Sequence, residues 1–250
     1  MTTDHHTVHL YSDYAWLWPL WGNVDDEYAQ WCALVHHVMQ RHARRELHTL
    51  LNLGCGGGKN MANLKQHYTV TGVDISSAML DLARQLNPTC TFVEADMRTC
   101  DLAQSFDAVL IDDAITYMTS RADLARVFRT ASDHLAPGGV MVVTPDHLVE
   151  TFQQNDTHVS HASASHKPAH LDVVFVENYY DPDPHDDTFE GTFLYLIREH
   201  GILRVVQDHS TLGLFTAAVW REALQECGFV VHEEVGMVHP EHPVFVCVKE

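Results

Sequence analysis

The sequence predicts an α/β protein built on a doubly wound, mostly parallel seven-stranded sheet, with an N-terminal helical segment and a small antiparallel β insertion. Two observations favour this class. From residue 49 onward, short apolar runs alternate with helical segments, which is the pattern of βαβ units. The runs are apolar on both faces, as expected for parallel strands that helices cover on each side.

An aromatic stretch near the start of the chain leads into the first predicted helix. Tyrosines and tryptophans recur between residues 11 and 21. Asp25 and Asp26 can then begin a helix that ends near Arg45. Apolar side chains recur along this helix every three or four residues and therefore share one face. These side chains are Tyr28, Trp31, Leu34, Val35 and Val38.

The strands and helices of the parallel sheet follow in alternation. We predict five strands at residues 50–53, 70–73, 91–94, 108–111 and 140–144. The helices between them are predicted at residues 60–66, 77–86 and 121–134. Pro137-Gly138-Gly139 predicts a turn that leads into the fifth strand.

The chain after residue 146 departs from this alternation. Residues 153–170 are polar and rich in histidine, and we expect an exposed loop there. Predicted strands at 173–180, 192–198 and 202–207 form an antiparallel insertion, in which Glu199-His200-Gly201 makes a hairpin turn. An edge strand of this insertion can pair across a homodimer. A helix at 216–227, closed by Gly228, and strands at 230–235 and 244–248 complete the chain.

The charge of the chain limits the partners that it can bind. Fifteen lysines and arginines stand against thirty-four aspartates and glutamates, so the formal net charge is −19 with histidine neutral. Binding of nucleic acid or of an anionic membrane surface needs clustered basic side chains, and we therefore expect neither partner. A small molecule or a cationic partner fits this composition better.

The cysteine and hydropathy patterns favour a cytoplasmic protein. The six cysteines are scattered without a C-x-x-C pair, which is typical of reduced thiols. The sequence shows neither a signal peptide nor an apolar run of the ~18 residues that a membrane span needs. Its twenty histidines lack the spacing of zinc ligands, and we expect no metal site.

A glycine-rich turn after the first strand is the strongest functional signal. Residues 50–60 read LLNLGCGGGKN, an apolar strand that leads into G-x-G-x-G at Gly54, Gly56 and Gly58. Without Cβ atoms, such a turn lets a ligand approach the backbone closely, although a purely structural turn is the alternative. A dinucleotide fingerprint needs glycine where the sequence has Lys59, and the G-K-[ST] ending of a nucleoside-triphosphate loop is missing.

Acidic side chains follow the next three strands at their carboxyl ends. Asp74 ends the second strand, and Asp96-Met97 follow the third. Asp112 and Asp113 follow the fourth. Ligands of open α/β sheets bind outside the carboxyl ends of the strands, so these residues can meet at one site. There, the Asp74 carboxylate can accept hydrogen bonds from both hydroxyls of a ribose.

This ordered set resembles the class I S-adenosylmethionine-dependent methyltransferases, in their small-molecule branch. The resemblance covers residues 50–144 and includes Phe106-Asp107-Ala108 in the fourth strand and Pro137-Gly138-Gly139 before the fifth. More narrowly, the chain is similar to bacterial N-methyltransferases of the sugar-nucleotide and glycine/sarcosine type. The resemblance implies a Rossmann-like fold and transfer of a methyl group from S-adenosylmethionine to nitrogen or oxygen of a small-molecule acceptor. The product of the cofactor is then S-adenosylhomocysteine.

One residue departs from the family pattern. Asn52 stands two residues before the first glycine, where the family usually carries Asp or Glu. That acidic residue supports the loop and, indirectly, the ammonium group of the cofactor. Since asparagine can still accept a hydrogen bond, the departure bears on cofactor affinity and not on membership of the family.

The resemblance also implies roles for the motif residues. Gly54, Cys55 and Gly56 line the methionine part of the cofactor. Asp74 holds the ribose, and an N-terminal tyrosine, Tyr14 or Tyr11, closes over the cofactor. Asp96 and Met97 hold the adenine, although Asp96 can instead cap a helix and Met97 can instead fill the core. Asp112, in preference to Asp113, borders the sulfonium. The cofactor-binding residues expected in this way are Tyr14, Gly54, Cys55, Gly56, Asp74, Ile75, Asp96, Met97 and Asp112.

Catalysis needs few dedicated side chains, because positioning alone can suffice for methyl transfer. An amine acceptor must arrive without its extra proton, which a nearby carboxylate or histidine can take. We predict His147, just past the fifth strand, as the first candidate and Tyr117 beside it. Tyr179 and His209 are further candidates.

Two other functions remain open from the sequence. The chain can be a methyltransferase-fold protein that binds the cofactor without catalysis, or a nicotinamide-dependent oxidoreductase, which Lys59 disfavours. We predict a single domain over residues 1–250. Its parts are an N-terminal lid at 1–46, a cofactor-binding core at 47–146, an antiparallel substrate cap at 147–212 and the C-terminal helix and strands of the core at 213–250.

Overall fold

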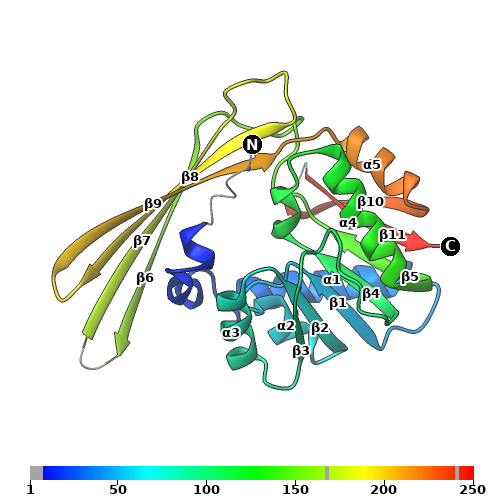
Figure 1. Ribbon diagram of the computed structural model, residues 1–250, viewed down its shortest axis with the longest axis horizontal. Coiled ribbons are helices and arrows are strands. Elements are labelled where there is room, and N and C mark those ends of the chain that lie inside the picture. The colour runs from blue at the N-terminus through cyan, green and yellow to red at the C-terminus, as the bar shows by residue number, and fades with distance from the viewer. Residues whose placement is uncertain (1–7, 167–168, 240–241) are drawn as a thin grey trace.

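Two sheets organise the chain in the computed structural model, which describes residues 8–166, 169–239 and 242–250 (Figure 1). The larger sheet has seven strands. Their spatial order is β10 (Phe229–His239), β11 (His242–Lys249), β5 (Leu135–Val143), β4 (Phe106–Ile111), β1 (Thr49–Leu53), β2 (Thr69–Asp74) and β3 (Thr91–Glu94). The predicted α/β class with a mostly parallel seven-stranded sheet is confirmed.

The strand order creates a switch point at the centre of the large sheet. Strands β1 to β5 run parallel, whereas β11 is antiparallel to both β5 and β10. From β1 the chain proceeds outward through β2 to β3 and then returns to β4, on the other side of β1. A crevice forms at the carboxyl ends of strands where the order reverses in this way, and it is there that open α/β sheets bind ligands.

Helices cover both faces of the large sheet. Buried side chains of α1 (Glu27–His42), α2 (Lys59–Leu64) and α3 (Ser77–Leu86) pack on one face. Those of α4 (Arg121–His134) and α5 (Ala217–Glu226) pack on the other. Helices α3, α4 and α5 begin after Ser76, Ser120 and Thr216, whose hydroxyls each accept a hydrogen bond from a backbone N–H of the first turn. Such caps satisfy donors that a helix start leaves unpaired.

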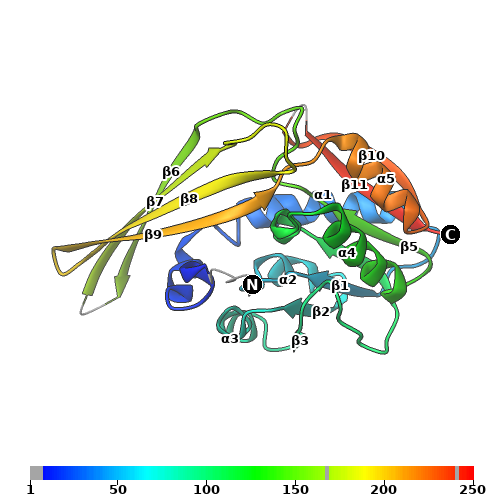
Figure 2. The ribbon, with the colours of Figure 1, turned by 45° about the horizontal axis from the view of Figure 1, so that its top comes forward.

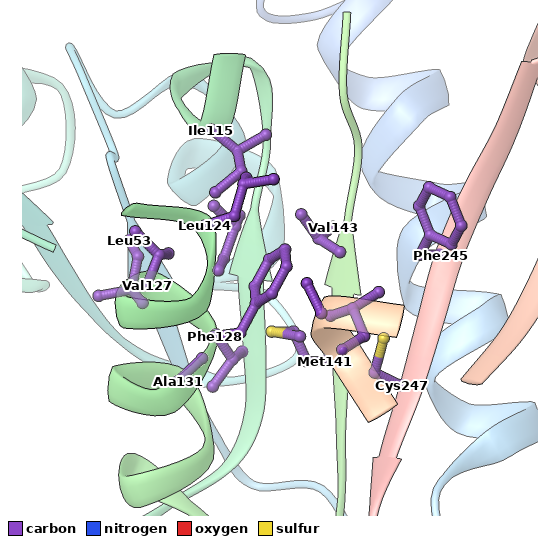
Figure 3. Packing of buried hydrophobic residues seen from close by; sticks show 14 of the residues in the cluster. Leu53, Ile115, Leu124, Val127, Phe128, Ala131, Met141, Val143, Phe245 and Cys247 are labelled. Carbon is purple, nitrogen blue, oxygen red and sulfur yellow. The ribbon is translucent and has the colours of Figure 1, made fainter. Parts of the chain in front are cut away.

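The core beneath α4 and α5 joins the two halves of the sheet. Leu53 of β1, Val143 of β5 and Phe245 of β11 belong to one buried cluster with Phe128 of α4 (Figure 3). The indole of Trp220 in α5 stacks on Phe245, with ring centroids 5.8 Å apart. Because each such side chain contributes about 1.5–3 kcal/mol when fully buried, this cluster stabilises the frame that carries the strand ends.

The second sheet is an antiparallel meander that extends away from the first (Figures 1 and 2). It consists of β6 (Asp156–His166), β7 (Ala169–Tyr180), β8 (Thr188–Glu199) and β9 (Ile202–Gly213). The exposed loop predicted at residues 153–170 is wrong, because β6 occupies most of this range and pairs with β7. As an edge strand with both faces largely in solvent, β6 keeps its ladder hydrogen bonds with hardly any apolar side chains.

The N-terminal aromatic stretch forms two short 3-10 helices, η1 (His9–Tyr11) and η2 (Ala15–Leu20), which pack against the second sheet. Trp21 stacks on Phe175 of β7, with ring centroids 5.1 Å apart. The buried carboxylate of Asp208 in β9 accepts hydrogen bonds from the backbone N–H groups of His9 (2.9 Å) and Leu10 (3.0 Å). One acidic side chain therefore anchors the start of the described chain to β9.

Three further findings concern the described residues as a whole. Their six cysteines are free thiols. No helix among them has the length and apolar character to cross a bilayer. They include no group of three or more His, Cys, Asp or Glu side chains arranged to hold a metal ion.

Candidate active site

The glycine-rich turn lies at the carboxyl end of β1, at the switch point of the sheet. Gly54 and Gly56 have φ angles of +71° and +50°, which favour glycine. The backbone N–H groups of Gly54 and Cys55 both donate to the carbonyl of Val73 at the end of β2. A Cβ on Gly54 would lie 2.3 Å from the Cβ of Ala114, just past β4. Only glycine therefore lets the turn approach the ends of both neighbouring strands.

Asp74 fixes the turn from the end of β2. Its carboxylate accepts hydrogen bonds from the N–H of Gly56 (2.7 Å) and from the N–H of Ser76 (2.9 Å). Burial raises the pKa of Asp74, and these backbone donors counter part of that rise. A carboxylate offers about four acceptor positions, so the Asp74 carboxylate can still accept a hydrogen bond from a ligand. Ile75 beside it is 69% exposed, and the side chain can cover an aromatic ring bound here.

Asp96 is already engaged by a neighbour. Its carboxylate accepts hydrogen bonds from Arg98 in a bidentate pair, with Nε donating to Oδ1 (3.0 Å) and Nη2 donating to Oδ2 (2.6 Å), and Oδ1 also accepts from the backbone N–H of the same residue (2.8 Å). Met97 turns the other way, with its Sδ 3.7 Å from the position that a Cβ of Gly54 would take. Of this pair, Met97 therefore lies against the glycine turn, while the Asp96 carboxylate holds Arg98.

Two buried polar groups beside the glycine turn have no partner among the described residues. Asn52 is 1% exposed, and neither its amide oxygen nor its amide nitrogen makes a hydrogen bond. The indole N–H of Trp18 is also unpaired, in a ring that covers Gly57 so closely that a Cβ there would clash. Buried polar groups are costly when unpaired, so a ligand with donors and acceptors fits this place.

Three aspartates gather where β4 and β5 end. Asp112 accepts hydrogen bonds from the indole N–H of Trp31 (3.0 Å) and from the amide of Asn60 (2.8 Å). Burial, and then the charge of Asp113, raise the pKa of Asp112 to about 8. Burial and the facing carboxylate of Asp113 also raise the pKa of Asp146. Asp113 and Asp146 still face solvent, which screens part of this effect.

A cavity of about 760 Å³ opens beside these aspartates. Its walls come from the first turns of α1, from the ends of β4 and β5 and from the segment that leads into β6. His147 is one of the lining residues, and its ring packs edge-on against Tyr179 (4.8 Å) and Phe189 (5.1 Å). The volume is in the range of small-molecule sites.

Two tyrosines meet on the other side of the strand ends. The hydroxyl of Tyr117 donates to that of Tyr11 (3.0 Å), and the hydroxyl of Ser76 donates to the backbone carbonyl of Tyr11 (2.5 Å). Burial raises the pKa of both tyrosines, so both hydroxyls stay protonated. Tyr14 instead packs against His9 and Trp16. Of the two N-terminal tyrosines, Tyr11 is thus the one that reaches the strand ends.

The sequence-predicted residues therefore divide into two groups. One group lies at the carboxyl edge of the large sheet and contains Tyr117, His147 and most of the expected cofactor residues. The cofactor residues in this group are Gly54, Cys55, Gly56, Asp74, Ile75, Met97 and Asp112. His209 lies at an exposed position of β9, in the second sheet, and is not part of the carboxyl edge of the large sheet. Asp146 was not predicted, although it follows β5 and the rule that found Asp74 and Asp112 applies to it equally.

Comparisons with known proteins agree with this geometry. A family model described as a methyltransferase domain matches residues 50–139. A dTDP-4-amino-2,3,4,6-tetradeoxy-D-glucose N,N-dimethyltransferase of Saccharopolyspora spinosa is 30% identical over 205 residues, which cover 79% of this chain and 78% of that protein.

Solved structures extend the likeness to the whole fold. The sugar N-methyltransferase KedS8 from Streptoalloteichus sp ATCC 53650 superposes with a TM-score of 0.82, at 26% identity and over 95% of this chain and 92% of that one. CalS10 from Micromonospora echinaspora, an amino pentose methyltransferase solved with S-adenosylmethionine bound, gives a TM-score of 0.76 at 24% identity, over 98% and 100% of the two chains.

The glycine turn, the Asp74 network and these likenesses lead to one conclusion. S-adenosylmethionine is the cofactor, and the acceptor is a small molecule. The chain belongs to the small-molecule branch of the class I S-adenosylmethionine-dependent methyltransferases.

Proposed function

We propose that the chain methylates the amino group of a small molecule, an amino sugar or a close analogue. The observation that carries this proposal is the group of three aspartates at the ends of β4 and β5, which opens into the 760 Å³ cavity. Carboxylates in that position attract an ammonium group and can take its proton, whereas a hydroxyl acceptor needs no such charge. The S. spinosa relative and KedS8, both named as N-methyltransferases of sugars, support nitrogen as the acceptor atom.

We propose the cofactor site at the glycine turn. Gly54, Cys55 and Gly56 line the methionine part there, and the Asp74 carboxylate accepts hydrogen bonds from the ribose hydroxyls. Ile75 and Met97 cover the adenine, and Asp112 lies near the methionine ammonium. Asp96 acts on the adenine only if it shares its carboxylate with Arg98. Tyr11, supported by its contacts with Ser76 and Tyr117, closes the site in place of Tyr14.

The chemistry asked of the protein is modest. When bound, S-adenosylmethionine supplies a methyl group on a positively charged sulfur, which a neutral amine displaces in line. The facing carboxylates of Asp113 and Asp146 accept the proton that the ammonium form must lose beforehand. The His147 ring forms a wall of the acceptor cavity, while the hydrogen-bonded hydroxyls of Tyr11 and Tyr117 lie at the neighbouring cofactor site.

Calorimetric titration tests the cofactor site, and product analysis tests the acceptor atom. We expect S-adenosylmethionine and S-adenosylhomocysteine to bind with micromolar Kd values and NADH to give no heat. Incubation with primary amino sugars should then yield N-methyl products, identified by mass spectrometry and by loss of reactivity toward amine reagents. Methylation of hydroxyl groups alone would refute the assignment to nitrogen.

We also propose the roles of the parts of the chain, and the homodimer, that the sequence suggested. Residues 1–46 act as lid, 47–146 and 213–250 as cofactor core and 147–212 as acceptor cap, in a cytoplasmic protein that binds neither nucleic acid nor membranes.

The edge strand β9 exposes Ile202, Leu203 and Val205, which supports a homodimer in which the second sheets of two copies pair. Light scattering of the wild type and of Val205→Lys tests it, since a lysine on the edge should give monomers.

A further inference from the structure

The cavity beside the three aspartates has an unusual balance of charge, and we call it the acidic cavity. Five of its described lining residues are aspartates or glutamates and two are histidines. None of the described lining residues is a lysine or an arginine. Its acidic members are Glu27, Asp112, Asp113, Asp146 and Asp156. One histidine, His158, lies 3.1 Å from the Asp156 carboxylate and is already paired.

Basic side chains near this part of the chain are committed elsewhere. The ammonium of Lys59 donates to the backbone carbonyls of Trp18, Trp21 and Gly22, beneath η2. The guanidinium of Arg121, at the start of α4, pairs with Asp187 at 3.6 Å. Neither residue lines the acidic cavity. An anionic group bound in the cavity would therefore face carboxylates without a compensating cation among its described lining residues.

The cavity also offers groups that recognise an organic cation. Tyr28 and Trp31 line it together with the three aspartates. The Lys59 ammonium already lies 5.2 Å from the centre of the Tyr28 ring, so Trp31 is the aromatic side chain that remains for a ligand. Aromatic faces beside carboxylates attract alkylammonium groups, because the ring quadrupole adds to the ionic attraction. The adjacent carboxylates repel one another, and a bound cation relieves this repulsion.

An unpaired hydroxyl is a second, independent sign of a polar ligand. Thr144, at the end of β5, lines the cavity and is 5% exposed. Its Oγ1 is buried and makes no hydrogen bond with any described residue. Since such groups are rarely left unpaired, we expect a hydroxyl or amine of the acceptor to complete this site.

From this we infer that the acceptor is a small, positively charged amine that carries no phosphate, with an ammonium group held between Asp113 and Asp146. The inference rests on the proposed N-methylation and goes beyond it by naming the charge class of the acceptor. It also separates this chain from its S. spinosa relative, whose name specifies an acceptor linked to dTDP, a nucleoside diphosphate. Two or more anionic charges on a diphosphate would meet the acidic side chains of the cavity other than Asp112, whose raised pKa keeps it largely protonated at pH 7.

Binding to the full-length protein saturated with S-adenosylhomocysteine tests the inference without turnover. Spermidine, which carries three ammonium groups, and dTDP serve as probes in calorimetry. We expect spermidine to bind with one-to-one stoichiometry and at least tenfold more tightly than dTDP. Its Kd should rise at least tenfold between 20 and 300 mM NaCl, because salt screens the attraction. Tighter binding of dTDP, or no measurable binding of spermidine at 10 mM, would overturn the inference.

Matched variants separate the cavity from the general negative charge of the protein. Asp146→Asn and Asp113→Asn should each weaken spermidine binding at least tenfold while the Kd of S-adenosylhomocysteine stays unchanged, which shows that the variants fold. Asp133→Asn removes the same charge from the exposed end of α4 and should leave spermidine binding unchanged. Equal effects of Asp146→Asn and Asp133→Asn would show binding to the surface at large and overturn the inference.

A pair of acceptors distinguishes failure of this inference from failure of the proposed function. Methyl transfer to 3-amino-3-deoxy-D-glucose is compared with transfer to dTDP-3-amino-3,6-dideoxy-α-D-glucopyranose. We expect a kcat/KM at least tenfold higher for the free amino sugar. N-methylation that prefers the nucleotide-linked sugar leaves the proposed function standing and overturns the charge class. O-methylation of either sugar, with spermidine binding as expected, contradicts only the proposed function.

Discussion

Asp74 shows how one side chain can serve the turn and the ligand together. Its carboxylate binds the N–H of Gly56 in the glycine turn and the N–H of Ser76 at the start of α3. Ser76 in turn caps α3 and holds the backbone of Tyr11. A change at Asp74 therefore loosens the glycine turn and, in the proposed cofactor site, removes an acceptor for the ribose.

We predict that Asp74→Ala weakens the binding of S-adenosylmethionine by about 1–3 kcal/mol, or roughly 5- to 150-fold in Kd, because buried donors lose their partner. Calorimetry of the variant measures the change. Asp81→Ala is the control, since Asp81 lies exposed on α3 and pairs only with Arg84. An unchanged Kd for Asp74→Ala would remove Asp74 from the proposed cofactor site.

Asp112 should make the ligand-free protein less stable as the pH rises. Its pKa is about 8 in the folded protein and near 3.9 in an unfolded chain, so the folded state holds the proton more tightly. The resulting contribution to stability is complete below about pH 4 and is lost as the pH rises through about 8. Urea unfolding at pH 5 and pH 8 should show it.

In the wild type, we expect the free energy of unfolding to fall between these two pH values, with Asp112 contributing roughly 1–3 kcal/mol after allowance for solvent screening. Asp112→Asn keeps an oxygen for Trp31 and should have a smaller fall over the same range. Identical pH dependence in the two proteins would show that Asp112 titrates normally.

At the scale of elements, Lys59 ties the first turn of α2 to η2. Its ammonium donates to the carbonyls of Trp18 and Trp21 and lies 4.7 Å from the centre of the Trp18 ring. Burial lowers the pKa of Lys59 to about 8, which is the cost of holding the charge beneath the N-terminal segment. The glycine turn and the N-terminal segment are thus linked through one side chain.

Lys59→Met should release η2 from the glycine turn, because the carbonyls of Trp18 and Trp21 lose their donor. We expect faster amide hydrogen exchange in residues 9–22 and a 5- to 30-fold higher Kd for S-adenosylmethionine, on the order of 1–2 kcal/mol. Lys65→Met is the matched control, since Lys65 ends the same helix but bonds to Leu86 and Asn87. Unaltered exchange in residues 9–22 would show that η2 holds its place without Lys59.

The elements of the large sheet were largely predictable, and those of the second sheet were less so. The helices at 77–86 and 121–134 have the predicted bounds, because apolar periodicity and a serine cap both mark them. Strand β6 lacks such a signal, since its side chains face solvent and its stability comes from pairing with β7. The 3-10 helices are set by packing on β7 and β8, which no local pattern in residues 9–20 reveals.

The same limit applies to the site. Residues that follow a strand directly, such as Asp74 and Asp112, could be found because strand ends converge. The contact of Tyr11 with Tyr117 joins residues 106 positions apart, and sequence alone could not choose between Tyr11 and Tyr14. The charge of the acidic cavity emerges only when α1, β4 and β5 are brought together.

At the scale of the whole molecule, the two sheets have separate hydrophobic cores. The large sheet has cores on both of its faces, whereas the second sheet shares one with η1 and η2. Phe175 and Tyr195 of the second sheet pack with Leu10 and Leu17 of the N-terminal segment. The N-terminal segment and the second sheet should therefore loosen together.

Phe175→Ala tests this coupling. We expect a loss of about 3–4 kcal/mol in the stability of the second sheet, because a buried ring is replaced by a cavity. Hydrogen exchange should accelerate in β7, β8 and η2 together while the strands of the large sheet stay protected. Val159→Ala, at a 65% exposed position of β6, is the control and should change little. Faster exchange in β7 and β8 without η2 would contradict a shared core.

The anchor of the N-terminal segment has a consequence for the order in which the protein is made. His9 and Leu10 are translated about two hundred residues before Asp208, whose carboxylate accepts hydrogen bonds from both of their backbone N–H groups. By then, strands β1 to β5, which pair with one another, have all been translated. His9 and Leu10 therefore reach this native contact only after most of the large sheet has been translated.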